Sequence, residues 1–125
     1  MNELIMVNSG LVPTFLALSM SLFACTGRSI TRAKEGILRN RIFTLRTAIY
    51  EYSYDKMMAP GNLRDLVSEG YLKRIPEDPM TESANSWRVM REDTSNAKDP
   101  SKPGIIDVRS GWHKTALDGS LYSDW

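Results

Sequence analysis

The stretch SITRAKEGILRNRIFTLRTAIYEYSY, residues 29–54, decides the fold because its apolar residues recur at helical spacing. Residues three and four apart share one face of an α-helix. One such stripe contains Leu38, Ile42, Leu45, Ile49 and Tyr52. A second, aromatic stripe beside it contains Phe43, Tyr50 and Tyr54. Two adjoining stripes predict a wide apolar face on which a small domain packs.

The first part of this stretch, residues 29–40, carries more charge and predicts a neck that projects from the domain. Polar side chains dilute its apolar residues, and they are Arg32, Lys34, Glu35, Arg39 and Asn40. The neck follows directly on the most apolar segment of the chain. We therefore expect one helical rod with an apolar beginning, a charged neck and a final half that carries a globular head.

The N-terminal segment, residues 1–28, is predicted to be a signal or membrane-anchor segment. No charged residue occurs between Glu3 and Arg28, and residues 11–24 form its continuous apolar part. A helix needs about 20 apolar residues to cross a bilayer. The length of residues 11–24 also suits the core of a signal peptide. Residues 29–125 are expected to form the head together with its helical rod.

A candidate lipidation site lies near the end of the N-terminal segment. Leu22-Phe23-Ala24-Cys25 resembles a bacterial lipobox, in which a small residue precedes a cysteine that is lipidated before cleavage. Cys25 is therefore either a lipid attachment site or a small apolar residue within the membrane segment.

The composition bounds the class of protein. The 125 residues are 42% hydrophobic and 25% charged, which is typical of one globular domain with an added segment. The formal net charge of +1 argues against a nucleic-acid partner, which normally meets a basic surface. A single cysteine excludes an intramolecular disulfide. The one histidine, His113, has no cysteine or serine motif beside it that would indicate a nucleophile pair.

A short second helix is predicted after the rod. Pro60 disfavours helical geometry in the residue before it and so ends the first helix. Asn62 is a good N-cap, and Asp65 stands at the third helical position, as in a capping box. Gly70 supplies the left-handed residue that often ends a helix.

The remaining residues predict a small antiparallel sheet. Residues 86–90 and 104–108 read as short strands, separated by the polar loop 91–103. A last strand or hairpin is expected over residues 115–122, where Asp118-Gly119 is a strong tight-turn signal. The predicted fold class is therefore α+β, with a long N-terminal α-helix packed against a short second helix and a small antiparallel β-sheet.

Three blocks of this sequence, taken in order, resemble a known family. They are LRTAIYEYSYDK at 45–56, APGNLRDLVSEGYLKRIPEDPMT at 59–81 and DVRSGWHKTALDGSLYSDW at 107–125. The arrangement resembles type IV pilin-like proteins and, among them, the major pseudopilin (G subunit) of type II secretion systems. The matching positions are Tyr52, Asp55, Pro60, Leu63, Leu66, Gly70, Tyr71, Leu72, Pro76, Asp78, Pro79, Trp87, Asp107, Ser110, Gly111, Asp118, Gly119 and Trp125.

This resemblance implies a structural role in protein transport. It implies a pilin-like fold and a subunit of a type II secretion or type IV pilus-related envelope machine. Its partners would be other pilin-like or pseudopilin subunits, the secretion machinery, and the membrane through the N-terminal segment. The head would be periplasmic and anchored in the inner membrane of a bacterial cell envelope.

The N-terminus leaves a second function open. The family's signature, a glycine followed by Phe-Thr-Leu-Ile-Glu, is absent here, and Glu3 in NELIMV is its nearest counterpart. The alternative is a lipid-anchored, pilin-like binding module of the cell envelope that does not polymerise, an outer-membrane lipoprotein held by Cys25. We expect no enzyme, because the sequence displays no catalytic constellation and its loops are too short to enclose a large pocket.

Three C-terminal aspartates are candidate metal ligands. Asp107, Asp118 and Asp124 could gather oxygen atoms around calcium, which takes six to eight such ligands. In the family that the sequence resembles, the C-terminal loop binds calcium. The alternative is that Asp118 serves the hairpin turn and Asp107 a hydrogen bond in a loop.

Overall fold

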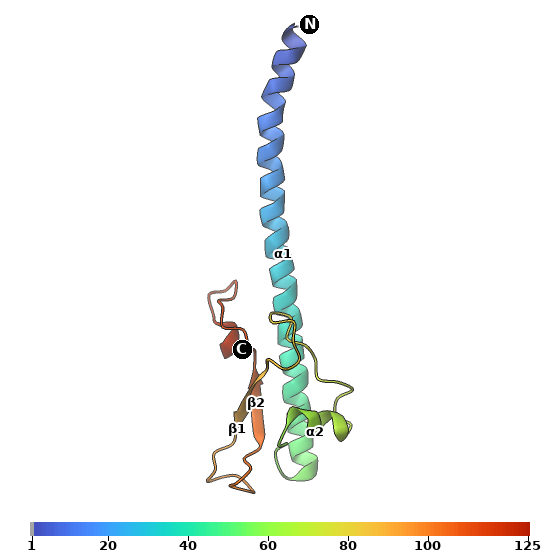
Figure 1. Cartoon of the computed structure of the whole chain (residues 1–125), viewed down its shortest axis with the longest axis vertical. Coiled ribbons are helices and arrows are strands. Elements are labelled where there is room, and N and C mark those ends of the chain that lie inside the picture. The colour runs from blue at the N-terminus through green and yellow to red at the C-terminus, as the bar shows by residue number, and fades with distance from the viewer. Residues whose placement is uncertain (1) are drawn as a thin grey trace. The chain divides into compact units, whose positions relative to one another are not determined.

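The computed structural model describes the backbone of residues 2–125 and the side chains of residues 27–125. Its elements are α1 (Asn2–Lys56), α2 (Leu63–Ser68), β1 (Arg88–Arg91), β2 (Ile105–Arg109) and the 3-10 helix η1 (Tyr122–Asp124). Figure 1 labels both α-helices and both strands. The chain divides into two compact units, Met1–Ala33 and Lys34–Trp125. Both strands, α2 and η1 belong to the second unit, which we call the head.

The described residues of the first unit belong to α1. The side chains of Arg28, Ile30 and Arg32 are exposed, and the Thr31 hydroxyl donates to the Gly27 carbonyl at 3.0 Å. Within the part of the chain that the structure describes, no helix is long and apolar enough to cross a membrane. The side chains of the predicted apolar segment before residue 27, including Cys25, lie outside the described residues.

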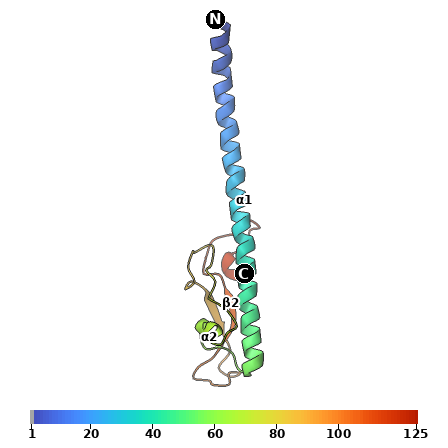
Figure 2. The same cartoon turned by 90° about the vertical axis from the view of Figure 1, so that its right-hand side faces the viewer.

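The first predicted stripe of α1 is confirmed as the base of the core. Leu38, Ile42, Leu45 and Ile49 are buried, and Tyr52 packs against them partly buried. Their partners come from the rest of the head, and the buried ones are Leu63, Leu66, Trp87, Ile105, Val108, Ala116 and Tyr122. In Figure 2 the strands and α2 lie on one side of this part of α1. Within the head, the strands, α2 and η1 therefore form a thin layer against one face of α1.

The aromatic stripe does not join this core, and the prediction of one wide buried face is wrong. Phe43, Tyr50 and Tyr54 are 70%, 70% and 73% exposed. At about 100° per residue these positions lie more than 100° around the helix from the middle of the buried stripe. A two-stranded sheet and a six-residue helix cover only the stripe itself.

The projecting neck is also corrected at its C-terminal end. Leu38 is fully buried, and Glu35 hydrogen-bonds residues near the C-terminus of the chain. The rest of the head therefore contacts α1 from Glu35 onward. The charge of residues 35–39 reflects contacts with a distant segment, which the local pattern did not reveal.

The second helix forms as predicted because its caps are local. The Asn62 side chain accepts from the Arg64 amide at 3.1 Å, and the Asp65 carboxylate accepts from the Asn62 amide at 3.0 Å, which completes a capping box. Gly70 follows with φ of +84°. Leu63 and Leu66 face the core.

The sheet consists of β1 and β2, paired antiparallel with Val89 opposite Val108. Both lie within two residues of the predicted strands. The predicted final hairpin is only partly right. Gly119 turns with φ of +88°, but one isolated bridge joins Thr115 to Leu121 and no third strand is added to the sheet. The segment lies on α1 instead and passes into η1, which buries Tyr122.

A buried carboxylate ties two loops of the head together. Asp78 is fully buried and accepts from the Ser110 hydroxyl at 2.6 Å, the Met80 amide at 2.8 Å and the Gly111 amide at 3.3 Å. Gly111 also packs closely on the backbone of Ser86, because a Cβ at residue 111 would lie 2.0 Å from the Ser86 carbonyl oxygen. These contacts position the segment that leads to the C-terminus.

Candidate functional site

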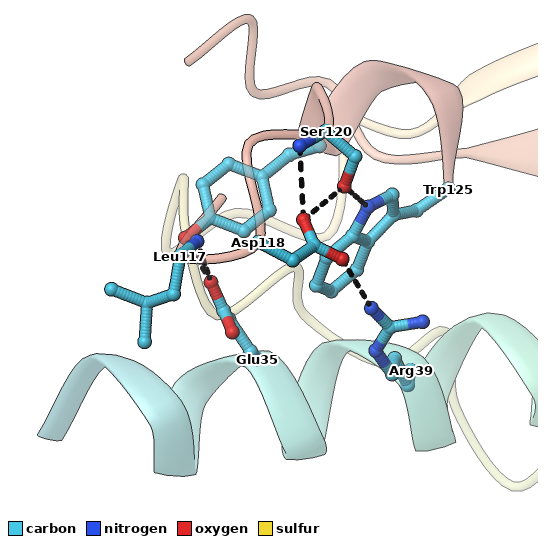
Figure 3. A network of polar contacts seen from close by, with 7 residues as sticks. Glu35, Arg39, Leu117, Asp118, Ser120 and Trp125 are labelled. Carbon is cyan, nitrogen blue, oxygen red and sulfur yellow. Dashed lines mark hydrogen bonds and ion pairs between the residues drawn. The ribbon is translucent and has the colours of Figure 1, made fainter. Parts of the chain in front are cut away.

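Glu35 anchors the C-terminal segment to α1. Its Oε1 accepts from the Leu117 amide at 2.8 Å and from the Tyr122 hydroxyl at 2.7 Å, as Figure 3 shows for the labelled Leu117. One carboxylate oxygen thus satisfies a backbone donor and a side-chain donor. Hydrogen bonds to a charged acceptor are stronger than neutral ones.

Arg39 holds the same segment one helical turn further on. Its guanidinium carbon lies 3.7 Å from the centre of the Trp125 ring, and its Nη2 lies 3.6 Å from Asp118 Oδ2 (Figure 3). A cation over an indole face is an attractive contact. We call this set the C-terminal latch, and its members are Glu35, Arg39, Leu117, Asp118, Ser120, Tyr122 and Trp125.

Hydrogen bonds within the latch order its turn. Asp118 Oδ1 accepts from the Ser120 amide at 2.9 Å and from the Ser120 hydroxyl. The Ser120 hydroxyl oxygen in turn accepts from the Trp125 indole nitrogen at 2.8 Å. The Ser120 hydroxyl, the Ser120 amide and nearby Arg39 hold the pKa of Asp118 below its usual value. Asp118 is therefore ionised near neutral pH and faces Arg39 as a carboxylate.

Tyr122 is the buried member of the latch. Its ring meets Trp125 edge to face with 5.1 Å between centres. Burial, followed by the hydrogen bond to Glu35 and the charge of that carboxylate, raises the pKa of Tyr122 to about 12. Loss of its proton would place a second negative charge beside Glu35.

The three predicted calcium ligands each face the guanidinium group of a different arginine. Asp107 accepts from Arg46 Nε at 2.7 Å, and Asp124 Oδ1 lies 3.9 Å from Arg109 Nη1, while Asp118 faces Arg39. Within the described part of the chain, no group of three or more His, Cys, Asp or Glu side chains is placed to hold a metal ion. Calcium binding therefore stays a prediction, as does lipidation of Cys25, whose side chain is not described.

Two of the tryptophans pack within the head. Trp87 is buried and its indole nitrogen donates to the Pro76 carbonyl at 2.7 Å. Trp112 is partly buried beneath Lys114, whose Nζ lies 4.9 Å from the ring centre. His113 is exposed.

The uncovered face of α1 is the second feature that suits a partner. The exposed rings of Tyr50 and Tyr54 stack with centres 6.4 Å apart and planes at 20°. Phe43 lies on the same face beside a hollow of about 460 Å³. That hollow is lined by Arg39, Ile42, Phe43, Arg46, Asp124 and Trp125. Exposed aromatic residues gathered on one face are typical of protein contact surfaces.

Sequence reasoning missed the latch because its signal is weak. Glu35 and Arg39 are four residues apart, a spacing that usually indicates no more than a surface pair along one helix. Their partners lie 79 to 87 residues away. No protein-family model, curated protein or solved structure matches this chain.

Proposed function

We propose that this protein is a structural, pseudopilin-like subunit of an envelope machine related to type II secretion and type IV pili. The observation that carries the proposal is the role of α1. This helix supplies Leu38, Ile42, Leu45, Ala48 and Ile49 to the core of the head, and the apolar run of residues 11–24 belongs to the same helix. An apolar helix that also carries a small head is the arrangement the sequence resemblance implies.

Two further features support a role in assembly. The face of α1 opposite the core exposes Phe43, Tyr50 and Tyr54, so the helix has a surface to offer a neighbour. The latch fixes the C-terminal segment on the same helix through Glu35 and Arg39. In this proposal the apolar segment sits in the inner membrane or a filament core, and the head faces the periplasm.

Filament preparation from the native host tests this function. We expect antibodies against the head to label filaments sheared from cells that overproduce the protein. Leu16→Arg should abolish this labelling, because a charge within the apolar run opposes both membrane insertion and helix packing. Cys25→Ser is the matched control and should still be labelled.

The alternative predicts the opposite pattern. A lipid-anchored module that does not polymerise, suggested by Leu22-Phe23-Ala24-Cys25, would stay in the membrane fraction and never appear in filaments. Cys25→Ser would then release the protein from the outer membrane. That result would favour the envelope binding module over the filament subunit as the function of this protein.

A further inference from the structure

Six positions on the uncovered face of α1 follow the spacing of a helix-pairing seam. Their separations alternate between four and three residues, and the positions are Gly36, Asn40, Phe43, Thr47, Tyr50 and Tyr54. In the heptad notation of coiled coils, residues 40, 47 and 54 are a positions and residues 36, 43 and 50 are d positions. Five of the six are exposed and Thr47 is half-buried. A seam with this spacing fits another helix.

Asn40 indicates which partner helix the seam binds. An asparagine at an a position is satisfied best by the same residue of a parallel, in-register partner, and it fixes register at a cost in stability. The Asn40 side chain is exposed and makes no hydrogen bond within the described part of the chain. Four residues before it, Gly36 leaves open space where a Cβ would stand, which allows close approach of two helices.

Charges beside the seam favour the same pairing. Arg46 is a g position and Glu51 is the e position five residues later, so a parallel pair sets each Arg46 against Glu51 of the other copy. An antiparallel pair would set arginine against arginine and glutamate against glutamate. Glu51 is exposed and has no hydrogen bond or ion pair within the described residues, and Arg46 uses Nε and Nη2 but not Nη1 inside the head.

We propose that this seam binds a second copy of the chain, helix to helix, parallel and in register. The pair would be closed by two-fold symmetry, with Phe43 and the stacked Tyr50 and Tyr54 as its apolar centre. The proposal goes beyond the filament role and does not require it. Parallel pairing also places Lys34 of both copies at the same end of the helix pair. Two chains anchored in one membrane require this arrangement.

Cysteine cross-linking of the full-length protein in detergent tests the register. In a Cys25→Ser background, Asn40→Cys and Tyr54→Cys are made separately and treated with a short bis-maleimide. The two positions are about 21 Å apart along the helix. Only a parallel, in-register pair brings each of these positions next to the same position of the other copy, so we expect both variants to give covalent dimers. Ser68→Cys, exposed on α2, is the control and should stay monomeric.

Antiparallel helices can bring at most one of these positions next to itself. A dimer from one variant alone, or from neither, would overturn the proposal. Glu51→Lys, added to each cysteine variant, tests the charge pairing by placing a lysine beside Arg46 of the other copy. We expect about fivefold less dimer, since two exposed ion pairs become repulsive. Glu82→Lys makes the same charge change away from the seam and should leave the yield unchanged; equal yields from both variants would contradict the register.

Discussion

Glu35 shows how much a single residue contributes to the head. Its two donors lie 82 and 87 residues further along the chain. Replacing it by alanine leaves the Leu117 amide and the Tyr122 hydroxyl without their acceptor. Water can replace the acceptor of the exposed Leu117 amide, but an unsatisfied buried donor such as the Tyr122 hydroxyl costs about 1–3 kcal/mol. We therefore expect Glu35→Ala to lower the free energy of unfolding by roughly 2 kcal/mol in denaturant titrations. Lys34→Ala, exposed and one residue away, should change it by less than about 0.5 kcal/mol. Equal effects of the two variants would show that the latch contributes nothing.

Tyr122 predicts a loss of stability at high pH. Its pKa is about 12 in the folded protein and about 10 in an unfolded chain. Below pH 10 both states hold the proton, so the contribution is fully present. Between pH 10 and 12 the unfolded state alone releases it, and the free energy of unfolding falls. Tyr122→Phe should remove this part of the fall in thermal melts. Tyr50→Phe, on the exposed seam, should keep the fall of the parent protein.

The three aspartates allow a direct test of the calcium hypothesis. Asp107, Asp118 and Asp124 each face a different arginine, so calcium would have to replace these partners. If it does, the bound ion should stabilise the folded state by about 2.7 kcal/mol at a hundredfold excess over its dissociation constant, whereas equal melting temperatures in millimolar calcium and in a chelator would contradict the calcium site. A rise that magnesium does not reproduce and that Asp124→Ala removes would establish the calcium site.

Residues whose partners are close in sequence could be predicted, and those with distant partners could not. The capping box of Asn62 and Asp65 closes within four residues, and the Gly119 turn is equally local. The latch depends on how the last residues return to α1. Residue type gave no sign of that return, because a Glu and an Arg four apart are common on any exposed helix.

At the scale of the helix, periodicity predicted which apolar residues share a face of α1. It did not predict how much of the helix surface the rest of the head covers. Leu38, Ile42 and Leu45 are buried as expected. Phe43 and Tyr50 belong to an equally regular stripe and are exposed. An apolar stripe indicates a helix surface that packs against another element. The size of the head decides whether the head itself covers that surface. Two strands and a short helix suffice for one stripe only.

The two faces of α1 should respond differently to the same change. Leu45→Asp buries an unpaired carboxylate in place of a leucine whose burial contributes about 1.5–3 kcal/mol, so we expect the head to unfold. Phe43→Asp, two residues earlier on the exposed face, should leave the melting temperature of the monomer within a few degrees of the parent value. Circular dichroism of both variants in detergent makes the comparison. Similar losses in both would show that the head covers the aromatic face as well.

At the scale of the whole molecule, the α+β class and the order of elements followed from the sequence. The third strand did not form, because residues 115–121 lie on α1 through Glu35 and Arg39 rather than along a sheet edge. The proposed function depends on both units of the chain: an apolar N-terminal segment and a head built on the same helix. The chemical state of the N-terminal segment therefore decides between a filament subunit and a lipid-anchored module.

The intact mass and N-terminal residue of the mature protein, purified from its native host, test the central proposal most directly. We expect a chain that retains the apolar run of residues 11–24, carries a methylated first residue and has an unmodified Cys25. Cys25→Ser should change this mass only by the replaced atom. A mature chain that begins with a diacylglyceryl-modified Cys25, with all earlier residues removed, would contradict the filament subunit and identify the protein as a lipid-anchored module.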